Sequence, residues 1–235
     1  MVSRLGAPLT QATNLFKPIP GTIPGMNSDI FFMQCGNPDC RFRFPLDLEQ
    51  FQGKLCPICG AMLTKTDPRL PQWIPPWRSG VFPELRLVLD NIRSAHNVGS
   101  IFRTSEGVGV TRLYLCGLTP SPEQNPAIAK TALGAQSRLD WQRHANCPDL
   151  CRQLKAEGFQ LIALEALPQA ANLFEWKPGV SQKIALVLGS EPAGVDPALI
   201  AIADEVVYIP MTGEKSSLNV SVACGVALYA LLTKY

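Results

Sequence analysis

The sequence lacks several features that would assign it to a common functional class. No run of 18 apolar residues occurs, since Ser221 interrupts even the most apolar segment, so we expect no membrane-spanning helix. The first residues lack the apolar core of a secretory signal, and we therefore expect a cytoplasmic protein. Only two histidines are present, His96 and His144, which argues against a site built on a Ser-His-Asp triad.

Glycine patterns that bind phosphate groups are also missing. There is no G-x-G-x-x-G spacing and no Walker sequence, which argues against an oxidoreductase that binds a dinucleotide on a doubly wound sheet. Charge is sparse as well: 17% of the residues are charged and the net charge is +2. A balance so close to neutral neither favours nor excludes a nucleic-acid partner.

The chain does have enough apolar residues for a sizeable core. Of its 235 residues 46% are hydrophobic, which predicts one domain of ordinary size plus a small appendage. Composition divides it into four parts: an extended arm (1–30), a cysteine-rich unit (31–63), a stiff linker rich in proline that contains Trp73 and Trp77 (64–84), and a main domain (85–235).

Four of the eight cysteines form two close pairs. Cys35 and Cys40 flank one turn, Cys56 and Cys59 flank another, and fifteen residues separate the pairs. This spacing predicts a tetrahedral zinc site in a small unit that looks like a zinc ribbon. A redox Cys-x-x-Cys or buried thiols are the alternatives, and neither explains the pairing. Whether this unit also binds RNA stays open.

The remaining cysteines are scattered through apolar or helical segments, where thiols are ordinary core residues: Cys116, Cys147, Cys151 and Cys224. Disulfides are not expected in the cytoplasm.

From residue 85 onward the pattern alternates between short apolar strands and helices. We expect strands at 85–89, 112–116, 161–164, 184–188 and 206–209, with a weaker one near Leu139, and helices near 98–107, 148–158, 197–204 and 218–232. This order predicts an α/β fold with a parallel sheet and helices on both faces.

A polar loop and helix start follow the first of these strands and contain Asn97. In a helix that starts near Val98, residues 98, 101, 102 and 105 form the inner stripe. Gly99, Arg103 and Glu106 then share the opposite stripe, which would leave room for a ligand beside Arg103. An exposed Arg103–Glu106 pair is the plainer alternative.

Two further polar loops follow later strands. One places Glu191 between Gly189 and Gly194, and the other leads into the last helix. Here we expect Ser216 or Ser217 to cap the helix, and we expect that helix to be buried on all sides because it is apolar on nearly every side. Asn219 and Ser221 would occupy its first turn, where backbone N–H groups attract electron-rich ligands. At this point, a purely capping role for Ser217 and Asn219 is equally open.

Three motifs occur in order on the expected strand ends: Asn-x-Gly-x-x-x-Arg at 97–103, Leu-Gly-x-Glu-x-x-Gly at 188–194, and Ile-Pro-Met at 209–211 followed by Ser-Leu-Asn-Val-Ser-x-Ala at 217–223. Together they resemble the SpoU branch of the SPOUT RNA methyltransferases over roughly 85–232. The resemblance implies a deep C-terminal trefoil knot, S-adenosylmethionine as cofactor, methyl transfer to a ribose 2′-hydroxyl of tRNA or rRNA, and a homodimer.

The resemblance also implies the site. Its functional positions correspond to Asn97, Arg103, Glu191, Ser217 and Asn219, and its cofactor contacts to backbone near Leu164, Gly189, Ile209 and Leu218, with Ser217 and Asn219 beside them. A non-catalytic RNA-binding or assembly module with the same fold is the alternative, and the five intact motif residues argue against it.

The family's proposed role for the arginine is that of a base. A guanidinium normally stays protonated, so holding a phosphate or stabilising alkoxide charge is an equal alternative for Arg103. Glu191 could orient Arg103 or its own loop.

Overall fold

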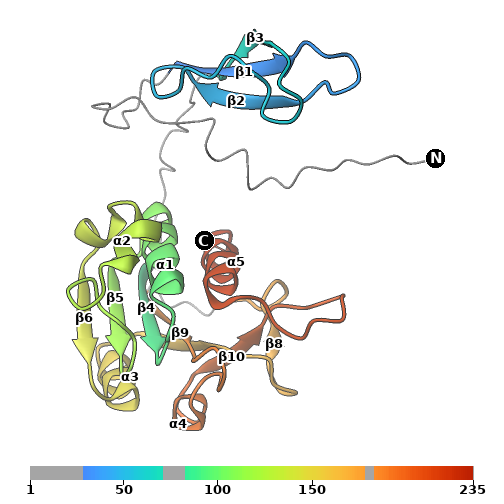
Figure 1. Cartoon of the computed structure of the whole chain (residues 1–235). Coiled ribbons are helices and arrows are strands. Elements are labelled where there is room, and N and C mark those ends of the chain that lie inside the picture. Colours follow the sequence, from blue (N-terminus) through green and yellow to red (C-terminus); the bar gives the residue numbers. More distant parts are fainter. Residues whose placement is uncertain (1–28, 71–82, 178–182, 235) are drawn as a thin grey trace. The chain divides into compact units, whose positions relative to one another are not determined.

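A computed structural model describes residues 29–70, 83–177 and 183–234. The chain divides into two compact units, Met1–Arg78 and Ser79–Tyr235 (Figure 1). The predicted arm, apart from its last two residues, and both linker tryptophans, Trp73 and Trp77, lie outside the described residues.

The first unit contains a three-stranded antiparallel sheet in the order β2-β1-β3. Its strands are β1 (Ile30–Cys35), β2 (Arg43–Asp47) and β3 (Leu63–Pro68). Strand β3 lies where we expected the start of the linker, because residues 63–65 pair with β1 and the Thr66 hydroxyl donates to the carbonyl of Phe32 at 2.7 Å. Met33 and Leu46 form a minimal apolar core beside buried Cys35 and Cys56.

The second unit is built on a seven-stranded sheet in the order β6-β5-β4-β9-β7-β10-β8, and every pairing is parallel. The strands are β4 (Glu84–Asp90), β5 (Arg112–Cys116), β6 (Trp141–His144), β7 (Gln160–Leu164), β8 (Ala171–Asn172), β9 (Lys183–Leu188) and β10 (Glu205–Tyr208). The predicted parallel α/β sheet is confirmed.

Helices cover both faces of this sheet (Figure 1). They are α1 (Ala95–Val108), α2 (Ala127–Ala132), the short 3-10 helix η2 (Ala135–Ser137), α3 (Cys147–Ala156), α4 (Pro197–Ile200) and α5 (Val220–Leu232). Strand β4 shows why both faces are buried: Leu85, Leu87 and Leu89 pack in the core under α1 and α5, and Val88 packs in the core under α3. None of the helices in the described ranges is long and apolar enough to cross a membrane.

Several boundaries differ from expectation for local reasons. Helix α1 begins one turn early because the Ser94 side chain caps it by accepting from the Asn97 N–H at 3.3 Å. Helix α4 ends at Ile200, since Asp204 instead joins β7 through hydrogen bonds with Leu161. The strand expected near Leu139 begins at Trp141, and α2, η2 and β8 were not predicted.

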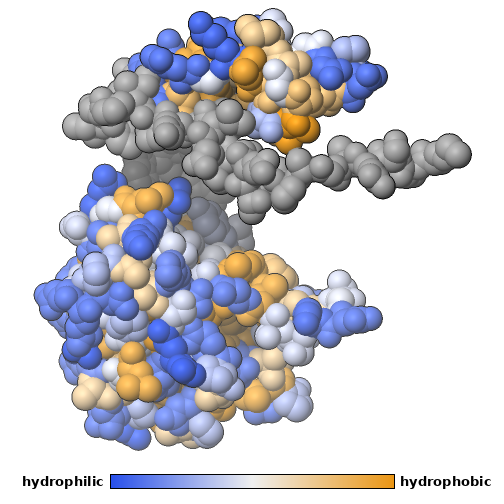
Figure 2. Space-filling view, in the orientation of Figure 1, coloured by the Kyte–Doolittle hydropathy of each residue, from blue (hydrophilic) through white to orange (hydrophobic). Residues whose placement is uncertain are grey.

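Helix α5 differs from expectation in two ways. Its N-cap is Asn219, whose side chain accepts from the Ser221 N–H at 2.9 Å, and not Ser216 or Ser217. Nor is it buried all round: Val222 is 51% and Tyr229 57% exposed. These two side chains lie seven residues apart and therefore share one face. Figure 2 shows hydrophobic residues gathered on the surface over α5.

Candidate functional site

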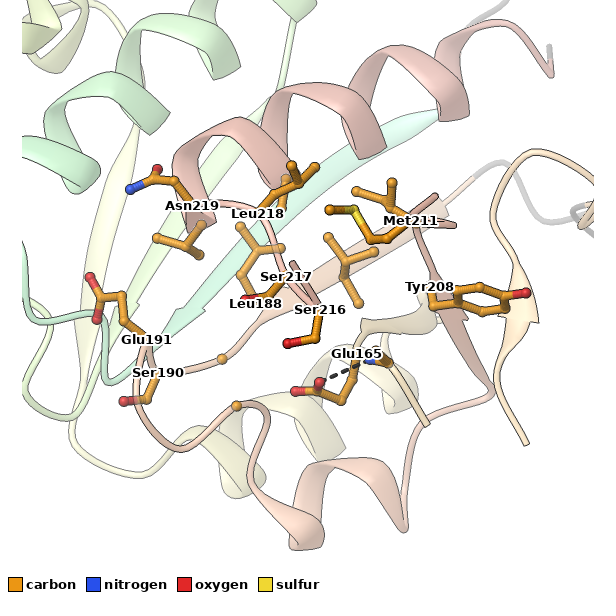
Figure 3. Close-up of a pocket in the computed structure, with 17 residues that line it drawn as sticks. Glu165, Leu188, Ser190, Glu191, Tyr208, Met211, Ser216, Ser217, Leu218 and Asn219 are labelled. Carbon is orange, nitrogen blue, oxygen red and sulfur yellow. Dashed lines mark hydrogen bonds between the residues drawn. The ribbon is translucent and has the colours of Figure 1, made fainter. Parts of the chain in front are cut away.

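A pocket of about 290 Å³ lies where β7, β9 and β10 end and α5 begins (Figure 3). The carboxyl ends of parallel strands are the usual ligand position in such a sheet. Its walls combine apolar and polar side chains: Leu164, Glu165, Ala166, Leu188, Gly189, Ser190, Glu191, Gly194, Tyr208, Ile209, Met211, Ser216, Ser217, Leu218, Asn219, Val220 and Ala223. All the positions that the resemblance linked to the cofactor line this one pocket.

A chain of hydrogen bonds joins three of the motif residues at one end of the pocket. The Asn97 amide donates to Glu191 Oε1 at 3.0 Å, and the Asn219 amide donates to Asn97 Oδ1 at 3.1 Å. Asn219 Oδ1 in turn accepts from the N–H and the hydroxyl of Ser221. Residues 94 to 122 positions apart in the sequence are thereby fixed relative to one another.

The carboxylate of Glu191 also fastens the loop that precedes α1. Its two oxygens accept from the backbone N–H of Arg93 at 2.8 Å and of Ser94 at 3.2 Å. Burial raises the pKa of Glu191, but these hydrogen bonds and the one from Asn97 outweigh it, so the pKa lies below its ordinary value. Glu191 therefore orients this loop and Asn97, and not Arg103.

The tight loop that carries Glu191 requires glycine at its base. Ser190 and Gly194 exchange backbone hydrogen bonds of 2.9 and 2.8 Å. A Cβ atom on Gly189 would lie 2.2 Å from the backbone of Gly194. No other residue fits such a close approach of two backbone segments.

Arg103 lies apart from the pocket. It is exposed on α1, six residues beyond Asn97, which corresponds to about 9 Å along a helix axis. It is not part of the wall of this pocket, and no hydrogen bond or ion pair among the described residues includes it. Glu106 pairs with Arg138 at 3.5 Å, and the Arg103–Glu106 pair that was the alternative interpretation is not among the ion pairs of the described residues.

The inner stripe of α1 is as predicted, but the space expected beside Arg103 is not open. Val98, Ile101, Phe102 and Ser105 are all buried. Gly99 is buried too, because α2 packs against it: a Cβ at this position would lie 2.3 Å from the carbonyl oxygen of Ile128. The absent side chain makes room for a helix, not for a ligand.

In the first unit the four predicted cysteines come together. Their sulfur atoms all lie within 4.8 Å of one another, with Cys35 and Cys59 at 3.4 Å and Cys40 and Cys56 at 3.8 Å. A zinc tetrahedron with bonds of about 2.3 Å places its sulfurs about 3.8 Å apart, so the cluster has the size that zinc requires. Backbone N–H groups of Asn37 and Ile58 point at the sulfurs of Cys35 and Cys56, at 3.4 Å each.

The thiols of this cluster ionise unequally. The backbone N–H of Ala61 and the Cys35 thiol lower the pKa of Cys59 to about 7. Burial raises the pKa of Cys35 to about 12. A metal cation would have to drive the ionisation of the more buried thiol.

Several pocket residues were not predicted from the sequence, above all Glu165. It directly follows β7 as Gly189 follows β9, so the rule that polar residues at strand ends line sites could have found it. No recognised motif contains it, which is why it was overlooked.

The match to a known protein family lies within the second unit. A model described as the SpoU rRNA Methylase family matches residues 84–229. The tRNA (guanosine(18)-2'-O)-methyltransferase of Escherichia coli K12 is 30% identical over 147 residues, which are 63% of this chain and 62% of that protein. The 23S rRNA (guanosine-2'-O-)-methyltransferase RlmB of Acinetobacter baylyi is 32% identical over 145 residues, 62% of this chain and 58% of that protein.

Among solved structures, an AdoMet-bound rRNA methyltransferase from Sinorhizobium meliloti aligns with a TM-score of 0.59 at 27% identity, covering 64% of this chain and 57% of that one. The chain thus spans less than two thirds of the length of these relatives. The cysteine-rich unit lies outside the family match.

Proposed function

The chain belongs to the SpoU rRNA methylase family, and from that membership we propose that it transfers a methyl group from S-adenosylmethionine to a ribose 2′-hydroxyl of tRNA or rRNA. One observation carries the proposal. Residues of three motifs, far apart in sequence, meet at a single pocket at the strand ends, with Glu191, Asn97 and Asn219 joined by hydrogen bonds at its edge.

The pocket fits the proposed cofactor in size and chemistry. Ligand pockets typically have volumes from about 300 Å³ upward and are lined by apolar groups with a few polar ones. Leu164, Gly189, Ile209 and Leu218 would hold S-adenosylmethionine by their backbone and apolar surfaces, with Ser217 and Asn219 beside them. When bound, the cofactor supplies an already activated methyl group on its sulfonium.

We assign the protein's own part in the reaction to positioning and electrostatics. Asn97 and Asn219, oriented by Glu191, would hold the RNA ribose against the open side of the pocket. Arg103 is exposed and outside the pocket wall, which favours a contact with the RNA phosphate or the developing alkoxide over a contact with the cofactor.

We also propose a homodimer. Val222 and Tyr229 are exposed on the same face of α5. Hydrophobic side chains that gather on one exposed face are unfavourable in a monomeric protein and are typical of an interface. Asn219, at the start of the same helix, belongs to the site, so a second copy packed on α5 would lie beside the pocket.

For the cysteine-rich unit we propose one zinc ion per chain, held by Cys35, Cys40, Cys56 and Cys59 in a zinc ribbon. The spacing of the four sulfurs supports it, as do the N–H groups directed at two of them. For the second unit we propose the family's trefoil knot at the C-terminal end, which the order of the motifs supports. Eight free cysteines favour the cytoplasm as the location.

The activity is tested by incubating the full chain with S-adenosylmethionine carrying a labelled methyl group and unmodified tRNA or rRNA. Nuclease digestion and mass spectrometry of the nucleosides should place the label on a ribose 2′-oxygen. Label on a base would contradict the proposed reaction. Cofactor binding without any transfer to either RNA class would favour the non-catalytic module. Mapping the 2′-O-methyl groups lost in a deletion strain would then identify the nucleotide.

A further inference from the structure

A second carboxylate lines the pocket, and the proposed reaction does not use it. Glu165 follows β7 directly, and its own backbone N–H donates to the carbonyl of Val207 at 2.9 Å, which continues the pairing of β7 with β10. Its side chain is half-buried and forms part of the pocket wall. Of the two carboxylates in this wall, Glu191 already accepts three N–H groups.

The carboxylate of Glu165 is held in place from two sides. Its Oε1 accepts from the Ala166 N–H and its Oε2 from the Val195 N–H, both at 2.9 Å. A Cβ on Gly194 would lie 2.4 Å from Oε2, so only glycine permits this contact. An ionised carboxylate offers about four acceptor positions. The two backbone bonds use one on each oxygen and leave one on each oxygen for a ligand.

The position of Glu165 in the pocket restricts what it can bind. Figure 3 shows Glu165 on the side of the pocket away from Asn219 and Glu191, with Ser216, Ser217 and Leu188 between them. The methyl group must face the edge where Asn219 and Glu191 lie, because the RNA is proposed to bind there. Glu165 therefore faces a part of the cofactor that lies beyond the sulfonium.

We propose that Glu165 accepts hydrogen bonds from the two ribose hydroxyls of the cofactor and thereby selects an adenosyl group with an intact ribose. The inference rests on the proposed function. Two preoriented oxygens with one free acceptor position each match two neighbouring hydroxyl donors. A carboxylate at the end of a parallel strand plays this part in dinucleotide-binding sheets, where it binds a ribose hydroxyl.

Two other roles give different measurable results. Glu165 could pair with the α-ammonium of the methionine part, or it could serve only to brace the 189–195 loop through Val195. The first role depends on the amino-acid part of the ligand, and the second depends on no particular group of the ligand. Three ligands separate them: S-adenosylhomocysteine, 5′-methylthioadenosine, which lacks the amino-acid part, and the 2′,3′-dideoxy analogue of S-adenosylhomocysteine.

Calorimetry on the full chain gives the test. The wild type should bind the dideoxy analogue at least about tenfold more weakly than S-adenosylhomocysteine, since hydrogen bonds to a charged acceptor are lost. Glu165→Gln should weaken both S-adenosylhomocysteine and 5′-methylthioadenosine by a similar factor, and it should leave the dideoxy analogue nearly unchanged. Glu191→Gln, the same change in the pocket's other carboxylate, keeps Glu165 and should therefore bind the dideoxy analogue more weakly than S-adenosylhomocysteine by the same factor as the wild type.

Each contrary outcome is distinct. Equal wild-type affinity for S-adenosylhomocysteine and its dideoxy analogue would overturn the inference even if Glu165→Gln does not fold. If Glu165→Gln weakens the binding of S-adenosylhomocysteine but not of 5′-methylthioadenosine, the carboxylate pairs with the α-ammonium of the ligand. If Glu165→Gln weakens the binding of all three ligands equally, the carboxylate only stabilises the 189–195 loop. Failure of the wild type to bind S-adenosylhomocysteine at all would instead refute the proposed function.

Discussion

The two units of this chain are stabilised by different means. The first unit, residues 29–70 as described, buries Met33 and Leu46 beside two cysteines and little else. The second unit buries two extensive apolar clusters, one on each face of its sheet. A unit with so small a core cannot offset its loss of conformational entropy by hydrophobic burial alone. In the first unit the cysteine cluster must therefore provide the stability that the apolar core provides in the second unit.

This contrast assigns separate tasks to the two units. Every pocket residue and the three hydrogen-bonded motif residues lie in the second unit, which its own core stabilises. The first unit carries the proposed metal and lies outside the family match. We therefore expect perturbation of one unit to leave the other intact, and the predictions below test this separation in order of expected effect.

The largest effect is expected from removing the metal. Structural zinc contributes roughly 10–16 kcal/mol of binding free energy in small metal-dependent domains, so Cys56→Ser or a strong chelator should unfold residues 29–70. Metal analysis should give one zinc for the wild type and a loss for Cys56→Ser, and hydrogen exchange should show loss of protection in this unit only. Cys116→Ser, which replaces a buried thiol of the second unit, is the control, and this variant should keep the zinc of the first unit. Absence of zinc from gently purified wild type would contradict the assignment.

The next largest effect concerns the reaction and not the fold. Arg103→Ala should lower methyl transfer at least about 100-fold, because a charged group that acts mainly in the transition state is removed. Affinity for S-adenosylhomocysteine should hardly change, since Arg103 does not line the pocket. Asn219→Ala, by contrast, should weaken binding as well as turnover.

Arg103→Lys sharpens this test. A role that depends on the planar guanidinium is not rescued by lysine, whereas a role that needs only positive charge recovers much of the rate. Full activity in Arg103→Ala would remove this residue from the mechanism. A matching loss of cofactor affinity would place it in the cofactor site.

A smaller effect is expected from the contact between α1 and α2. Gly99→Ala should destabilise the second unit by about 1–3 kcal/mol, because the new methyl group would overlap the backbone of Ile128. Gly107→Ala in the same helix meets no atom within 4 Å and should be neutral or slightly stabilising. Denaturant unfolding of both variants measures the difference. Equal stabilities would show that the two helices can move apart freely.

The smallest effect is a dependence on pH. The folded protein lowers the pKa of Glu191 below its ordinary value of 4.5, so its carboxylate stabilises the fold above that pH and loses this contribution as pH falls through the lower folded pKa. Glu191→Gln should therefore be less stable than the wild type at pH 7, by less than about 1 kcal/mol because the group is exposed, and the gap should close in acid. A difference in stability between wild type and Glu191→Gln that is the same at pH 7 and pH 3 would contradict the assigned hydrogen bonds.

Much of the second unit could be predicted from its sequence. Five strands were found within a residue or two because short β-branched and leucine-rich runs are buried on both faces of a parallel sheet. Strand β6 was displaced and α2 was missed, since both are short and their residues owe their conformation to tertiary contacts, such as the packing of α2 on Gly99.

The site was predicted unevenly for a similar reason. Loops at strand ends must converge in a parallel sheet, so the meeting of Glu191, Ser217 and Asn219 follows from the strand order. The hydrophobic periodicity of the sequence does not specify distances of a few ångströms. It therefore could not predict that Asn219 caps α5 or that Glu191 accepts a hydrogen bond from Asn97. The prediction of open space beside Arg103 was wrong because it assumed that the missing side chain of Gly99 leaves a void. Protein interiors are close-packed, and α2 fills this position.

The most direct test of the separation between the units is calorimetry of S-adenosylhomocysteine with the full chain and with a fragment of residues 79–235. Because every pocket residue lies in the fragment, the two dissociation constants should agree within about a factor of two. A fragment that is folded but binds at least tenfold more weakly, or not at all, would show that the first unit contributes to the cofactor site and would contradict the account.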